Sequence, residues 1–161
     1  MTSTIKQLAA QLGTQLKQCE WKLVTAESCT GGGLAYFITN ITGSSDWFER
    51  GFVTYSNTAK TELLGVRLST LNNDGAVSEQ AAREMAEGAL QHAEAQVSIA
   101  ITGIAGPIGG TPDKPVGTVW FSIASIHAET QTSMRVFSGD RQTVREQSIQ
   151  VALEKLLQFI K

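Results

Sequence analysis

The segment with the clearest chemical potential is a glycine-rich turn that follows a short apolar stretch. Residues 21–26 are partly β-branched and predict a strand, and Ser28 then precedes three consecutive glycines, which predict a turn into a helix. Backbone N–H groups at such a turn stabilise the oxyanion that forms when a hydroxyl attacks an amide or ester. Ser28 is therefore a candidate nucleophile, with N–H groups near Thr30 and Gly31 as oxyanion donors. On spacing alone, simple helix capping by Ser28 or Thr30 is the favoured alternative.

A serine nucleophile requires a base, and the two histidines are poor candidates for this role. His92 falls at the polar end of a predicted helix and His127 in a hairpin connection, where a surface role is the default. Lys60 falls at about the third position of a helix that begins near Asn57, where the helix dipole lowers the pKa of an ammonium, as burial would. A neutral lysine can act as a general base, so a Ser–Lys pair is chemically coherent. The alternative is a solvated surface lysine.

Three further features stay open as ligand or catalytic sites. The glycine-rich segment 102–110 follows a predicted strand, where ligands often bind in α/β sheets, although it matches no nucleotide-binding motif and a plain turn is the alternative. Arg141 or Arg145 can hold a phosphate or a carboxylate, or lie on a helix surface. Cys29 is a rival nucleophile, since a helix start lowers the pKa of a thiol, but it has no histidine partner.

Helices and strands that alternate along the chain must position these residues. The apolar periodicity predicts one three-layer α/β sandwich with a mixed sheet, as a single domain over residues 1–161 without a linker. The predicted helices begin near Ile5, Thr30, Asn57, Ser78 and Asp140, and the predicted strands cover residues 21–26, 51–55, 97–101, 116–125 and 130–137.

Composition excludes several classes of protein. The 161 residues are 42% hydrophobic and 17% charged, which supports one packed core and argues against a disordered chain. Thirteen basic and fifteen acidic residues give a net charge of -2, so we expect no nucleic-acid partner. Two cysteines without a metal-binding spacing suggest neither a disulfide framework nor a metal site. No apolar stretch is long enough for a signal peptide or a membrane span, so we expect no membrane partner and a cytoplasmic protein.

Seven ordered sequence blocks together resemble the CinA carboxy-terminal domain family, from about residue 5 to the end of the chain. The likeness is greatest to the family's stand-alone members, which are nicotinamide-nucleotide amidases. The blocks cover residues 26–32, 43–48, 55–60, 75–78, 102–107, 114–119 and 137–141.

This resemblance implies a three-layer α/β/α sandwich with a five-stranded mixed sheet. It also implies hydrolysis of the carboxamide of nicotinamide mononucleotide to nicotinate mononucleotide and ammonia, a step of pyridine-nucleotide salvage, with neither a metal nor another cofactor. The family's serine nucleophile falls on Ser28 and its lysine base on Lys60, and Tyr55 in the same block is expected to orient the pair.

The remaining expectations concern the substrate and partners. The candidates for binding the nucleotide are Gly32, Thr102, Gly103 and Gly106, with Arg141 for the phosphate. A non-catalytic module that binds or senses a nucleotide is the alternative function. A homo-oligomer built through the hairpin strand or the last helix is possible in either case.

Overall fold

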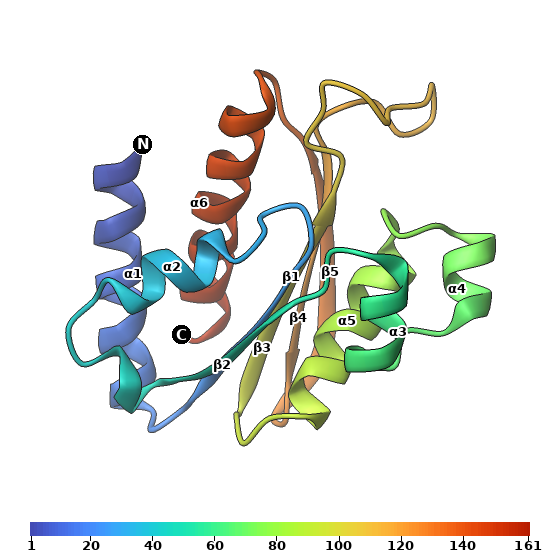
Figure 1. Cartoon of the computed structure of the whole chain (residues 1–161). Helices are drawn as coiled ribbons and strands as arrows, with labels where there is room; N and C mark the ends of the chain where they lie inside the picture. Colours follow the sequence, from blue (N-terminus) through green and yellow to red (C-terminus); the bar gives the residue numbers. More distant parts are fainter.

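Five strands form one mixed sheet in the order β2-β1-β3-β4-β5 in the computed structural model, which describes residues 1–161 (Figure 1). Strand β1 (Leu23–Glu27) lies between β2 (Phe48–Val53) and β3 (Val97–Gly103) and pairs in parallel with both. Strands β4 (Thr118–Ser125) and β5 (Ala128–Val136) continue the sheet in antiparallel pairing. The connection from β3 to β4 and the hairpin from β4 to β5 contain no helix and reverse the chain, whereas helical crossovers keep β1, β2 and β3 parallel.

Helices cover both faces of the sheet, which confirms the predicted three-layer α/β/α sandwich with five strands (Figure 1). One large apolar cluster fills the space between the sheet and the first and last helices, and a second lies under α5. On one face lie α1 (Thr2–Gln18), α2 (Gly33–Thr39) and α6 (Arg141–Phe159). On the other face lie α3 (Asn57–Leu64), α4 (Leu68–Asn73) and α5 (Glu79–Gln91).

The position of β1 between β2 and β3 determines where the candidate residues meet. Every residue of β1 is buried, and alternate side chains enter the two clusters, Leu23 on the α1 and α6 side and Val24 on the α5 side. Because β1 and β2 are parallel neighbours, their carboxyl ends lie at the same edge of the sheet. Ser28 follows β1 there, and residues 54–60 follow β2, so this edge gathers segments that are distant in sequence.

Several predicted boundaries are wrong for identifiable reasons. Helix α2 begins at Gly33 rather than near Thr30, because Gly31 and Gly32 have φ values of +59° and +90° and extend the turn. Helix α3 begins at Asn57 as predicted, and Ser56 caps it, since the Ser56 hydroxyl accepts a hydrogen bond from the N–H of Ala59 at 3.0 Å. Strand β2 starts three residues before the predicted strand, at Phe48.

Two short elements were not predicted at all. A single 3₁₀ turn, Ser44–Asp46, precedes β2, and α4 (Leu68–Asn73) packs near α5. Neither has a side-chain cap at its start, so the sequence carries no local signal for where they begin. The caps of the long helices are different: Ser78 and Asp140 both cap the helices predicted for them.

Helices α3 and α5 approach most closely at Gly88, where a Cβ atom would overlap the carbonyl oxygen of Leu64. We expect Gly88→Ala to lower the free energy of unfolding by about 1–3 kcal/mol, because the added methyl group must push α3 away from α5. Urea unfolding measures the change. Gln91→Ala at the exposed end of α5 is the control and should stay within about 0.5 kcal/mol of wild type. Equal stability of the Gly88 and Gln91 variants would contradict this close approach.

Candidate active site

Ser28 and Lys60 meet at the carboxyl edge of β1 and β2. The Lys60 Nζ atom lies 3.0 Å from Ser28 Oγ, and the two side chains are 1% and 8% exposed. Lys60 reaches this point from the first turn of α3, and Ser28 is held in place by its N–H, which donates to the carbonyl of Ile101 at 2.9 Å. The structure therefore brings together the two residues that the sequence analysis proposed as a pair.

Two backbone carbonyls orient the amine of Lys60. Its Nζ donates to the carbonyl oxygens of Thr54 at 2.9 Å and Tyr55 at 3.1 Å. Carbonyl oxygens only accept hydrogen bonds, so these contacts use two N–H bonds of the amine and leave its third direction facing Ser28 Oγ. None of the five ion pairs includes Lys60, and burial lowers its pKa from the ordinary value for lysine. A neutral Lys60 presents its lone pair to the Ser28 hydroxyl.

Tyr55 contacts Lys60 through its backbone carbonyl rather than through its ring. Its carbonyl holds Lys60, while its side chain is 60% exposed and its hydroxyl accepts a hydrogen bond from Arg141 Nη2 at 2.9 Å. Arg141 also donates through Nη1 to the carbonyl of Gly106 at 2.8 Å. This arginine therefore joins the end of β2, the loop after β3 and the start of α6 into one rim around the Ser–Lys pair.

The free backbone donors beside Ser28 differ in part from those expected. The N–H of Gly31 donates to the carbonyl of Ser28 at 3.0 Å and is therefore occupied. The N–H groups of Cys29, Thr30 and Gly32 donate to no backbone carbonyl, and that of Gly32 acts on the Glu27 carboxylate. The N–H groups of Cys29 and Thr30 are therefore the candidate donors to an oxyanion in this turn, whereas Thr30 and Gly31 were expected.

Glu27 is a site residue that the sequence analysis missed. Its fully buried carboxylate accepts hydrogen bonds from the N–H of Leu34 at 2.8 Å and of Ala35 at 3.0 Å. Burial raises the pKa of Glu27, and these hydrogen bonds act in the opposite direction. The start of α2 is thus occupied by this carboxylate, which fixes the helix against the turn that carries Ser28. In the sequence, the only signal for this role of Glu27 is an acidic residue at the end of an apolar run.

Arg145 reaches the turn that carries Ser28 from α6. Its Nη2 donates to the carbonyl of Thr30 at 3.1 Å, and its buried Nε has no hydrogen-bond partner. A cavity of about 440 Å³ opens between α2 and α6 beside it. The cavity is lined by Gly33, Phe37, Arg141, Gln142, Arg145, Glu146 and Ile149.

The other expected substrate-binding residues shape the backbone of this edge. The Thr102 hydroxyl donates to the carbonyl of Ala76 at 2.8 Å. A Cβ atom on Gly103 would overlap Val119, so close strand packing accounts for this glycine. Gly106, with φ +80°, offers its carbonyl to Arg141, and Gly32 precedes α2 in a left-handed conformation.

Each histidine contacts another part of the chain. His92 Nδ1 lies 2.7 Å from the carbonyl of Gly88, and His127 stacks on Trp21 with ring centroids 4.9 Å apart.

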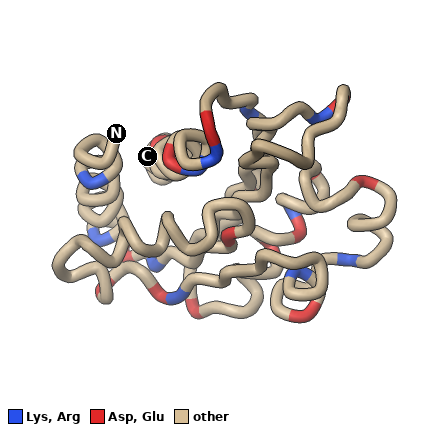
Figure 2. The backbone as a smooth tube through the Cα atoms, turned by 45° about the horizontal axis from the view of Figure 1, so that its top comes forward, with Lys and Arg blue, Asp and Glu red and all other residues tan.

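Figure 2 shows acidic and basic residues interspersed along the chain. No three His, Cys, Asp or Glu side chains are grouped so as to hold a metal ion. None of the helices has both the length and the apolar character that crossing a membrane requires.

Comparison with known proteins shows which family the chain belongs to. The sequence model of the CinA C-terminal domain matches residues 5–160. The chain belongs to the CinA C-terminal domain family. Within it, nicotinamide-nucleotide amidohydrolase PncC of Escherichia coli strain K12 is 54% identical over 97% of this chain and 94% of its own length. The protein of the same name from Pseudomonas putida is 46% identical over 96% of each chain.

Solved structures of CinA proteins agree with the fold. The crystal structure of a competence/damage inducible protein from Agrobacterium tumefaciens has a TM-score of 0.95 and 42% identity, and the match covers 98% of this chain and 96% of that one. A CinA superfamily protein from Escherichia coli has a TM-score of 0.92 and 42% identity, and covers 96% of this chain and 90% of its own.

Proposed function

We propose that the chain is a nicotinamide-nucleotide amidase, which hydrolyses the carboxamide of nicotinamide mononucleotide to nicotinate mononucleotide and ammonia by a Ser–Lys mechanism. The observation that carries the mechanism is the buried contact of 3.0 Å between Lys60 Nζ and Ser28 Oγ. The observation that carries the substrate is the 46% to 54% identity to amidohydrolases of that name over nearly the whole chain.

In the first half of the reaction, neutral Lys60 takes the proton of Ser28 while Oγ attacks the carboxamide carbon. The resulting tetrahedral intermediate collapses when Lys60 returns the proton to the nitrogen, and ammonia leaves. The nicotinoyl group is then an ester of Ser28. In the second half, Lys60 takes a proton from water, the hydroxide attacks the ester carbon, and the acid product departs as the proton returns to Ser28 Oγ.

The oxyanion of each tetrahedral intermediate is held by the N–H groups of Cys29 and Thr30. Both donors lie in the turn that presents Ser28, and neither donates to a backbone carbonyl. Donors that are already oriented stabilise developing charge without reorganisation, which makes them effective in catalysis. Glu27 supports them indirectly, because it anchors the helix that follows the turn.

The phosphate of the nucleotide is bound by the guanidinium groups at the start of α6. Arg141 already faces the rim of the site, and Arg145 has a buried N–H without a partner beside the cavity of about 440 Å³. Guanidinium groups form strong charge-assisted hydrogen bonds with phosphate oxygens. Phe37 provides an aromatic wall in the same cavity.

The direct test is to incubate the purified chain with nicotinamide mononucleotide, without added metal, and to measure ammonia and the acid product. We expect both to accumulate in equal amounts. Tight binding of the nucleotide without ammonia release would contradict the amidase and favour a non-catalytic nucleotide-binding or sensing module.

The role of Cys29 as a rival nucleophile gives a second prediction. The side chain is 5% exposed within the apolar core, and burial raises the pKa of its thiol to about 11, so the thiolate is not available at neutral pH. We expect Cys29→Ala to keep ammonia release within about threefold of wild type, since the proposed oxyanion donor at this position is the backbone N–H. A loss as large as that from replacing the proposed serine nucleophile would contradict this assignment.

The cellular setting follows from the same proposal. We propose that residues 1–161 act as one amidase domain in the cytoplasm, in pyridine-nucleotide salvage. The continuous sheet supports a single domain, and the two free cysteines, Cys19 and Cys29, fit a reducing compartment. The homo-oligomer stays a prediction.

A further inference from the structure

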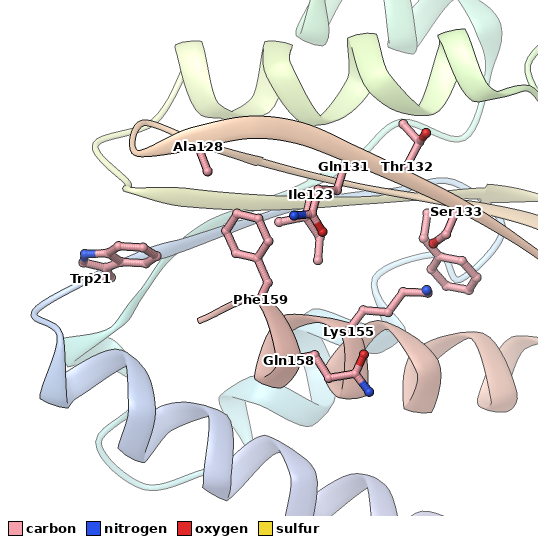
Figure 3. A pocket seen from close by; sticks show the side chains of 10 residues that line it. Trp21, Ile123, Ala128, Gln131, Thr132, Ser133, Lys155, Gln158 and Phe159 are labelled. Carbon is pink, nitrogen blue, oxygen red and sulfur yellow. The ribbon is translucent and has the colours of Figure 1, made fainter. Parts of the chain in front are cut away.

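A second cavity lies between the strands β4 and β5 and the last turns of α6, and neither Ser28 nor Lys60 lines it (Figure 3). Its volume is about 350 Å³, within the range of sites that hold small organic molecules. Three aromatic side chains contribute to its walls: Trp21, Phe121 and Phe159. Such flat apolar walls favour a ligand that contains an aromatic ring.

One cation, Lys155, enters this cavity without a partner of opposite charge. Figure 3 shows its side chain extending from α6 toward Ser133 on β5. Its Nζ lies 5.8 Å from the centroid of the Phe121 ring, takes part in no hydrogen bond or ion pair, and is partly buried. Burial, and then the neighbouring charge of Arg135, lower the pKa of Lys155, while Glu154 acts weakly in the opposite direction. An anion beside Lys155 would relieve both effects.

Polar side chains also line the cavity. Gln131 and Ser133 belong to β5 and line the cavity, and Gln158 on α6 lines it as well. Thr132 differs from its two neighbours, because its hydroxyl donates to Glu79 on the other face of the sheet. Amide and hydroxyl donors can therefore satisfy the second oxygen of a carboxylate held by Lys155.

The cavity and the amidase site lie on different strands of the sheet. Trp21, at one end of the cavity, lies two residues before β1, whereas Ser28 directly follows that strand. The other end of the cavity, at Phe121 and Ser133, lies level with Glu27 and is separated from Ser28 across the sheet, because β3 stands between β1 and β4. The cavity shares no lining residue with the cavity beside Arg145, so a ligand here would not occupy the amidase site.

We propose that this cavity is a second ligand site, which binds a small aromatic monocarboxylate with its ring between the aromatic walls and its carboxylate on Lys155. The site is independent of the amidase reaction. The ring supplies the apolar contact, the carboxylate supplies the missing counter-charge, and the cavity volume limits the ligand to about one or two rings.

Benzoate is the test ligand, and benzamide, which has the same shape without the charge, is its matched control. Titrations followed by calorimetry and by the indole N–H resonance of Trp21 should show saturable benzoate binding that is at least about tenfold tighter than benzamide binding, because a charged hydrogen bond is lost in the amide. Lys155→Met should reduce benzoate affinity to the benzamide level and leave ammonia release unchanged. Lys155→Gln, which keeps a polar side chain, should do the same and covers the case in which the methionine variant is unstable.

Binding at the amidase site is excluded by competition with the nucleotide. Saturating nicotinamide mononucleotide, added to Ser28→Ala so that it is not consumed, should leave benzoate affinity and the Trp21 shift unchanged. Benzoate affinity that falls in the presence of the nucleotide but not in the Lys155 variants would overturn the proposal, and so would equal affinity for benzoate and benzamide, or no saturable shift of Trp21.

Discussion

Replacing Ser28 with alanine should lower kcat/KM for ammonia release from nicotinamide mononucleotide by at least about 10³-fold, since removing a nucleophile abolishes the covalent route and leaves only binding and oxyanion stabilisation. The fold should persist, because the only side-chain hydrogen bond of Ser28 is with Lys60 and the backbone N–H still donates to Ile101. Steady-state ammonia assays, with the affinity for the nucleotide measured separately, check both statements.

The matched control for this variant is Ser45→Ala. Ser45 is an exposed serine in the 3₁₀ turn before β2 and makes no side-chain hydrogen bond, so its replacement should leave ammonia release at the wild-type level. If Ser28→Ala released ammonia as fast as the Ser45 variant, Ser28 would not be the nucleophile.

The second large effect concerns Lys60. Lys60→Met keeps the length of the side chain but removes the base, and it should lower kcat/KM by about 10²- to 10⁴-fold, the usual contribution of general acid–base catalysis. Lys60→Arg should be equally inactive, because a guanidinium stays protonated and cannot accept the proton of Ser28. Substantial activity in the arginine variant would contradict the role of a neutral amine.

The pH dependence of the wild-type enzyme follows from the same lysine. Only neutral Lys60 can accept a proton, so kcat/KM should rise with pH and level off above the pKa of Lys60. Burial lowers the pKa of Lys60, so the midpoint of the rise in kcat/KM should lie at a lower pH than the ordinary pKa of a lysine. A pH profile of ammonia release measures it, and a profile that falls over this range would contradict the model of a neutral base.

Protein stability gives a separate measurement of that pKa. Since the folded-state pKa of Lys60 is lower than the unfolded-state value of about 10.4, the unfolded chain binds more protons between the two values. The free energy of unfolding of wild type should therefore rise relative to that of Lys60→Met as pH increases through this window. Below the folded-state pKa the difference should be constant and least favourable to wild type.

Much of the fold could be predicted from local patterns. Helices α5 and α6 have caps at Ser78 and Asp140 and long apolar stripes, and β1 is a buried run that ends in a glycine-rich turn. These signals lie within a few residues of the elements they specify, because caps and hydrophobic periodicity act locally. Helix α4 has no such signal and was not predicted.

The site itself depended on contacts between distant segments. Ser28 and Lys60 are 32 residues apart, and Tyr55 and Arg141 are 86 apart. Their proximity follows from the order of the strands, which local patterns do not specify. Local patterns also do not show which backbone N–H groups are already bonded. The N–H of Gly31 donates within the turn, and the Glu27 carboxylate accepts from the start of α2.

The most direct test of the Ser–Lys mechanism is to quench the reaction with nicotinamide mononucleotide in acid during the first turnover and to map the modified peptide by mass spectrometry. The mechanism predicts a nicotinoyl nucleotide ester on Ser28, which is absent from Ser28→Ala. An adduct on Cys29, or full ammonia release by the Ser28 variant, would contradict it.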